Sequence, residues 1–200
     1  MTESEAKIMG RHRGFDQRAV VTAARQLFWE RGYEGASLPE LEAVTGLNRS
    51  SLYNTFGSKR GLFDAAVESY LVEVVRPRLA VLMQDPVPPG AVTSYVQNLR
   101  TALLDAQSMS ARNGCLLINT AGSTLGHDKV TQATVDAYRQ ELLTGVTRGV
   151  AAHRPDLTQG EVERRAQACV GQIVAALALA RINAEAAGRS LDTALELLNT

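Results

Sequence analysis

From Phe15 onward, apolar residues recur at helical spacing, and no stretch alternates apolar with polar residues. Positions three and four apart share one face of an α-helix, whereas a half-buried strand needs a period of two. The chain is also rich in Ala, Leu, Arg and Glu, which favour helices. We therefore predict an all-α protein, and 200 residues are enough to bury a substantial core.

Composition excludes several classes of protein. With 21 Lys+Arg against 21 Asp+Glu, the chain has no global field that would attract nucleic acid, so any binding patch is local. Two Cys are too few for a disulfide framework, and no spacing of metal ligands is present, so we expect no metal and no cofactor. The N-terminus lacks the apolar core of a signal peptide, and the longest apolar run, 173–180, is too short to span a membrane. We predict a soluble cytoplasmic protein without a membrane partner.

The composition also changes along the chain. All four Phe and the single Trp precede residue 64, which suggests a compact aromatic unit followed by an aliphatic helical one. We predict a flexible basic arm at 1–14, a three-helix domain at 15–63 and a larger helical domain at 64–200.

Local signals place short helices in the N-terminal unit. Ser37 and Glu40 form a capping box, Gly46 ends the helix that follows, and Asn48 is placed to cap the next one. Two short helices joined by a glycine-containing turn are typical of a helix-turn-helix. The expected helices of this part of the chain cover residues 16–31, 38–45, 49–55 and 59–84, the last with a kink at Pro77.

The second helix of this motif has the chemistry of a DNA-reading element. Leu47, Leu52 and Phe56 are expected to point inward, and acidic residues are confined to the preceding helix, with its own solvent face. Arg recognises guanine edges and Asn adenine edges, and no carboxylate is present between residues 48 and 60 to repel phosphate. The competing interpretation is a helical hairpin with an ordinary polar surface. The predicted outward residues are Asn48, Arg49, Ser50, Ser51, Tyr53, Asn54 and Thr55.

Two segments, LFWERGYEGAS at 27–37 and GLNRSSLYNTFGSKRGLF at 46–63, closely resemble the DNA-binding region of the TetR (tetracycline-repressor) family of bacterial regulators. The resemblance covers about residues 15–65. A weaker resemblance to some branches of the family lies in GCLLINTA at 114–121. The sequence departs from the family pattern at Asn54 and Thr55, where an aromatic residue or His is common, and at Gly57, where Pro is frequent.

The resemblance implies a homodimer whose paired recognition helices enter successive major grooves of a palindromic operator in double-stranded DNA. By position, Arg49, Ser50 and Ser51 would face bases. Ser37, Tyr53 and Lys59 would contact phosphates. In the arm, Arg11 and Arg13 have two interpretations, a solvated tail or a contact with the minor groove of DNA. The resemblance also implies that the C-terminal domain holds the dimer interface and a pocket for a small molecule, and that repression is the usual mode of regulation.

In the C-terminal part, helices are expected at 89–106, 114–122, 128–152, 160–186 and 190–199. The helix at 160–186 is apolar over much of its circumference, and a second apolar face suggests a partner subunit. Together with the last helix it would form a four-helix dimer interface. The competing interpretation is a central helix buried within one chain. The predicted interface residues are Ala166, Cys169, Val170, Ile173, Leu177, Ala180, Leu191, Leu195 and Leu198.

An effector among the C-terminal helices would change the separation of the paired recognition helices and so the affinity for DNA. A pocket lined by the candidate residues favours an apolar-to-amphipathic molecule with one or two hydrogen-bonding groups. Ordinary core packing is the competing interpretation for every candidate pocket residue. The candidates are Met83, Tyr95, Leu99, Leu103, Leu117, Asn119 and Tyr138.

Three other functions compete with DNA-binding regulation. His and Cys residues lack the arrangement of a nucleophile or metal site and no phosphate-binding glycine loop is present, so we do not expect an enzyme. A thiol-based redox sensor that uses Cys115 or Cys169 is the main alternative, although apolar neighbours favour inert thiols. A pure interaction protein that has lost DNA binding is the third possibility.

Overall fold

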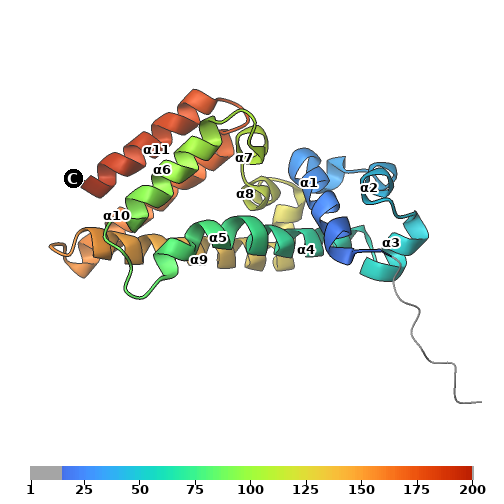
Figure 1. The fold of residues 1–200 in the computed structure, drawn as a ribbon, viewed down its shortest axis with the longest axis horizontal. Coiled ribbons are helices and arrows are strands. Elements are labelled where there is room, and N and C mark those ends of the chain that lie inside the picture. Colours follow the sequence, from blue (N-terminus) through green and yellow to red (C-terminus); the bar gives the residue numbers. More distant parts are fainter. Residues whose placement is uncertain (1–14, 200) are drawn as a thin grey trace, which may run out of the picture.

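The computed structural model describes residues 15–199 and is all-α over that range, as predicted (Figure 1). The predicted arm at 1–14, with Arg11 and Arg13, lies outside the described residues. Helices α2 and α3 lie at one end of the molecule, and α6, α10 and α11 lie toward the other (Figure 1). None of the helices in the described part of the chain combines the length and apolar character needed to span a membrane.

The N-terminal helices pack around a cluster of aromatic rings. Phe28 of α1 meets Phe63 of α4 edge to face, with ring centroids 5.1 Å apart, and Tyr33 contacts the same Phe63 ring at 5.2 Å. Helix α1 was expected to end at Arg31 but continues for one more turn beyond a break at Gly32, which brings Tyr33 onto this cluster. The bounds are α1 Gln17–Gly35, α2 Leu38–Thr45, α3 Arg49–Phe56 and α4 Lys59–Tyr70.

Helix α4 belongs to a longer rod that joins the two ends of the molecule. The rod continues through a π-helical turn at Leu71–Val75, helix α5 at Arg76–Leu79 and a 3-10 turn at Ala80–Met83. Because Pro77 has no N–H to donate, an undisturbed α-helix there would lose a hydrogen bond. The π-helical turn just before Pro77 absorbs this defect, so the expected kink takes the form of a bulge.

The C-terminal helices form a layered bundle in which α10 and α11 pack against each other, α6 covers α11 and α9 covers α10. Gly149 of α9 permits the close approach of α6 and the end of the rod. Buried leucines and valines from these helices continue the core of the N-terminal unit without interruption. The bounds are α6 Ala91–Leu104, α7 Met109–Asn113, α8 Leu116–Ala121, α9 Lys129–His153, α10 Gln159–Leu179 and α11 Ala184–Asn199.

Two expected helix boundaries in this region were wrong. The segment preceding α8 contains a further short helix, α7, whose N-terminus is capped by Ser108. The break between the last two helices lies at residues 180–183 rather than near Gly188. Asn183 accepts a hydrogen bond from the N–H of Ala186 at 2.9 Å, and Gly188 lies inside α11 against Leu104.

The predicted dimer-interface residues of α10 and α11 lie inside the single chain. Ala166, Cys169 and Ile173 of α10 are fully buried, as is Leu191 of α11, because the neighbouring helices of the same chain cover them. Leu195 is half-buried and packs on the same core. The second apolar face of α10 is therefore explained by burial within one chain, which was the competing interpretation. The other members of the buried set are Val170, Leu177, Ala180 and Leu198.

Adding one methyl group at Gly149 tests the packing of α9. A Cβ there would lie 2.7 Å from Val92 Cβ and 2.8 Å from Leu82 Cδ2. Gly149→Ala should lower the free energy of unfolding by about 1–3 kcal/mol in urea titrations, because the core cannot accommodate the methyl group without strain. The control is Gly35→Ala, whose Cβ meets only Arg31 Cβ at an ordinary 3.5 Å. Equal stability of the two variants would contradict this packing.

Candidate nucleic-acid interface

The N-terminus of α2 is closed by the predicted capping box. The N–H and the hydroxyl of Ser37 both donate to Oε2 of Glu40, at 2.9 Å and 2.6 Å, and the hydroxyl oxygen accepts from the N–H of Glu40 at 3.4 Å. The hydrogen bonds from Ser37 lower the pKa of the Glu40 carboxyl. Both donors of Ser37 are thus engaged within the chain before any phosphate arrives.

Helix α3 is capped by residues from two elements. Gly46 ends α2 in the left-handed region, with φ 69°, and Asn48 Oδ1 then accepts from the N–H of Ser51 at 2.9 Å. A carboxylate oxygen of Glu42 also accepts a very short hydrogen bond from the N–H of Arg49. The expectation that the acidic residues of α2 keep to a separate solvent face is therefore wrong for Glu42. This carboxylate helps to fix α3 on α2.

One face of α3 is anchored and the other is open. Leu52 is buried, and Leu47 and Phe56 are half-buried against the core, as the sequence predicted. The open face carries hydroxyl, amide and guanidinium groups and no carboxylate, which suits the donors and acceptors of a major groove. Asn48, Arg49, Ser50 and Asn54 are exposed, and Ser51, Tyr53 and Thr55 are half-buried.

The guanidinium of Arg49 is positioned by its own helix. Its Cζ atom lies 5.3 Å from the centre of the Tyr53 ring, one turn further along α3. A cation over an aromatic face is attracted to the negative side of the ring. The Tyr53 ring therefore holds the Arg49 guanidinium close to the surface of α3.

Lys59 is similarly positioned at the start of α4. Its Nζ lies 4.6 Å from the centre of the Tyr33 ring. Partial burial lowers the pKa of Lys59, and the nearby carboxylates of Glu34 and Glu40 act in the opposite direction. Lys59 is the first residue of α4, so its cation lies at a helix N-terminus, where backbone N–H groups also favour an anion such as phosphate.

The close approach of α3 and α4 depends on Gly61, which sequence reasoning did not single out. A Cβ at this position would lie 2.0 Å from the carbonyl oxygen of Phe56, the last residue of α3. Ser58 caps α4 by accepting from the N–H of Gly61 at 3.0 Å. The end of α3 can therefore lie this close to α4 only because residue 61 has no side chain.

Polar contacts tie this interface to the rest of the chain. Arg60 donates to Asp64 Oδ1 at 2.7 Å and to Asp128 Oδ2 at 2.8 Å, so α4 is joined to the N-terminus of α9. Hydrogen bonds from Thr131 and Arg60 lower the pKa of Asp128 to about 2. Thr124, in the turn before α9, also donates a very short hydrogen bond to a carboxylate oxygen of Glu34 on α1.

A buried contact joins α1 to the segment between α7 and α8. The indole N–H of Trp29 donates to the carbonyl oxygen of Gly114 at 3.1 Å. The same ring meets Tyr70 edge to face at 4.9 Å. Cys115, which follows Gly114 in the chain, is buried, and its Sγ lies 4.0 Å from the hydroxyl of Tyr138. Movement of the Gly114 segment would therefore reach α1 directly.

The predicted effector-pocket residues do not share one described cavity. Leu117 lines a small cavity beside Arg60 of α4, whereas Tyr138 lines a shallow groove beside Arg76 and Glu141. Burial raises the pKa of Tyr95 and of Tyr138. Tyr95, Leu99 and Leu103 are buried in the core, and Met83 and Asn119 are half-buried.

The N-terminal part of the chain is similar to known regulatory proteins. Residues 20–66 match the family model described as bacterial regulatory proteins, tetR family. The HTH-type transcriptional regulator YezE of Bacillus subtilis is 38% identical over 124 residues, which cover 60% of each chain. Residues 20–66 therefore form a domain of the TetR family. The aligned part of this chain therefore spans less than two thirds of the length of YezE.

Two further relatives are similar to a larger part of the chain. The HTH-type transcriptional repressor BdcR of Escherichia coli is 28% identical over 159 residues, covering 80% of this chain and 78% of that protein. A cysteine mutant of the TetR family regulator CifR, complexed with 26-bp operator DNA, has a TM-score of 0.76 at 27% identity, covering 93% of this chain and 98% of that one. These relatives are transcriptional regulators, and members of the family are not enzymes.

The depressed pKa of Asp128 gives a pH test of the joint between α4 and α9. A carboxyl whose pKa is lowered by folding stabilises the protein above its unfolded pKa, near 3.8, and loses this contribution as pH falls toward about 2. Asp128→Asn should therefore be less stable than the wild type at pH 7, and the difference should shrink below about pH 4. Urea titrations over this range measure it.

The matched control is Asp136→Asn, an exposed position on the same helix. This variant should follow the wild type at every pH. A deficit of Asp128→Asn that stays constant down to pH 2.5 would contradict the charged contact with Arg60.

Proposed function

We propose that this protein is a ligand-responsive, sequence-specific DNA-binding regulator of transcription, and that it acts as a repressor in the cytoplasm. The observation that carries the proposal is the open face of α3, which presents Arg49 and Asn54 without any carboxylate. Membership of the TetR family supports it, since TetR-family regulators bind DNA and are typically repressors. The chemistry of the face and the family thus point to the same partner, double-stranded DNA.

We propose roles for the individual residues of this interface. Arg49, Ser50 and Ser51, in the first turn of α3, would read base edges in the major groove. Tyr53 and Lys59, each engaged in a cation–π contact, would hold phosphates beside the major groove. Ser37 would contribute through rearrangement of its hydrogen bonds with Glu40. Asn48, Asn54 and Thr55 would complete the contact surface.

We further propose that two copies of the chain bind a palindromic operator. One helix-turn-helix contacts few bases, so two half-sites about 34–36 Å apart are needed for specificity. The predicted interface residues are buried within the chain, so the partner would instead meet the outward face of α10. That face carries Ala168, Gly171 and Ala178, and Ile182 beyond its end is 74% exposed.

The division into 15–63 for DNA binding and 64–200 for effector binding and dimerisation gives a route for release. An effector held among the C-terminal helices would shift the segments that carry Gly114 and Asp128. Trp29 and Arg60 hold α1 and α4 to these segments, so the shift would move α3 relative to its partner copy. If the shifted state binds the effector more tightly, DNA affinity falls by the same coupling free energy.

Arg49→Ala tests the reading of bases. The variant should lose about 1–3 kcal/mol of binding free energy on the preferred operator and lose much less on unrelated duplexes, because a base contact specifies sequence. Lys59→Met should instead weaken all duplexes about equally and reduce the slope of log K against log salt by about 1. Fluorescence anisotropy at several salt concentrations measures both.

The matched control is Arg139→Ala, which removes an exposed cation from α9. It should bind every duplex as the wild type does. Equal losses for Arg49→Ala and Arg139→Ala, or unchanged affinity in Arg49→Ala, would overturn the assignment of α3 as the reading helix.

The alternative, a thiol-based sensor, has less support from the surroundings of the two thiols. Burial raises the pKa of Cys169 to about 12, which disfavours the reactive thiolate. Cys115 is 1% exposed and lies among tyrosines. We expect operator affinity to be unchanged after treatment with diamide and to be the same in Cys115→Ser. Loss of DNA binding on oxidation that Cys115→Ser prevents would favour the alternative.

A further inference from the structure

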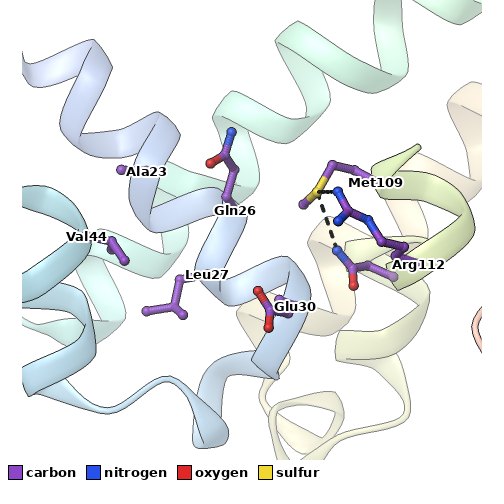
Figure 2. A pocket seen from close by; sticks show the side chains of 8 residues that line it. Ala23, Gln26, Leu27, Glu30, Val44, Met109 and Arg112 are labelled. Carbon is purple, nitrogen blue, oxygen red and sulfur yellow. Dashed lines mark hydrogen bonds between the residues drawn. The ribbon is translucent and has the colours of Figure 1, made fainter. Parts of the chain in front are cut away.

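An open cleft lies between the N-terminal helices and α7, away from the face of α3. Its volume is about 620 Å³, which is in the range of small-molecule sites. Gln26, Leu27 and Glu30 of α1 form one wall, Val44 of α2 extends it, and α7 forms the opposite wall (Figure 2). None of the residues predicted to form the effector pocket lines this cleft.

One part of the cleft is aliphatic. Val44 is 45% exposed and lines this part of the cleft, and the largely buried Leu27 of α1 lines it too. Met109 faces them from α7 (Figure 2). Methionine side chains adapt to ligands of different shape, and no aromatic ring lines the cleft. The lining therefore suits a flexible aliphatic group.

The other part carries a cation without an acidic partner. Arg112 forms no ion pair with any described carboxylate, and the one described hydrogen bond of its guanidinium is donated to Met109 Sδ at 3.3 Å (Figure 2). A thioether is a weak acceptor, so most of the five guanidinium donors are left for solvent or a ligand. Glu30, the acidic residue of the cleft, is paired instead with its neighbour Arg31 at 3.2 Å.

We propose that this cleft is a binding site for a small aliphatic monocarboxylate. The carboxylate would form a bidentate contact with Arg112, whose planar fork matches its geometry. The alkyl chain would lie against Leu27, Val44 and Met109 and would remove the exposed side chain of Val44 from water. The carboxylate of Glu30 in the wall of the cleft disfavours ligands with two negative charges. The site is independent of the proposed DNA binding, because it involves none of the residues of that face.

Isothermal titration calorimetry with octanoate tests this site on the full chain. The probe should bind with one site per chain and a Kd of about 0.1 mM, the affinity expected for a ligand of this size. Octan-1-ol, which has the same chain without the charge, should bind at least about tenfold more weakly, because it cannot form the charge-assisted contact. Octylamine should bind no better than the alcohol.

Variants of the two charged residues separate this site from nonspecific binding. Arg112→Gln should weaken octanoate by at least about tenfold, whereas Glu30→Gln should tighten it. Arg139→Gln, which removes an exposed cation outside the cleft, should leave the affinity unchanged. Both Arg positions are exposed, so neither change disturbs the core. Octanoate affinity that is unchanged in Arg112→Gln, equal binding of octan-1-ol, or no saturable binding below 5 mM octanoate would overturn the proposal.

Discussion

The position of α3 depends on the aromatic packing between α1 and α4. Phe63 lies against both Phe28 and Tyr33, so α1 and α4 form a single support. Tyr33 also lies beneath the cation of Lys59, and Gly61 lets the end of α3 approach α4. Edge-to-face ring contacts have a defined geometry and strengthen the core beyond simple burial of area. The same rings that stabilise the core therefore set the distance between the open face of α3 and the lysine beside it.

The two parts of the molecule are joined through polar contacts as well as through the rod of α4 and α5. Trp29 holds α1 to the carbonyl of Gly114, and Arg60 holds α4 to Asp128. Each contact links a helix of the DNA-binding unit to the start of a C-terminal helix. A packed core with directional contacts at its boundary switches between discrete arrangements rather than deforming continuously. The C-terminal helices are thus in direct contact with α1 and α4, the two helices that support α3.

The sequence was sufficient where structure depends on neighbouring residues and insufficient where it depends on distant ones. The bounds of α2 and the start of α3 followed from Ser37, Gly46 and Asn48, because caps and glycine turns act locally. The contact of Glu42 with the N-terminus of α3 depends on how the turn folds back, and periodicity does not reveal it. The interface residues of α10 were misassigned because apolar circumference alone does not distinguish a neighbouring helix of the same chain from a partner subunit.

The central claim is that α3 reads sequence in the major groove and is presented twice by a symmetric pair of chains. Selection of bound duplexes from a random DNA library tests both parts of this claim together. The account predicts an enriched palindrome whose half-sites are about one helical turn apart. Enrichment of a single unrepeated half-site would contradict the symmetric pair, and a pool without any enriched sequence would contradict the reading helix itself.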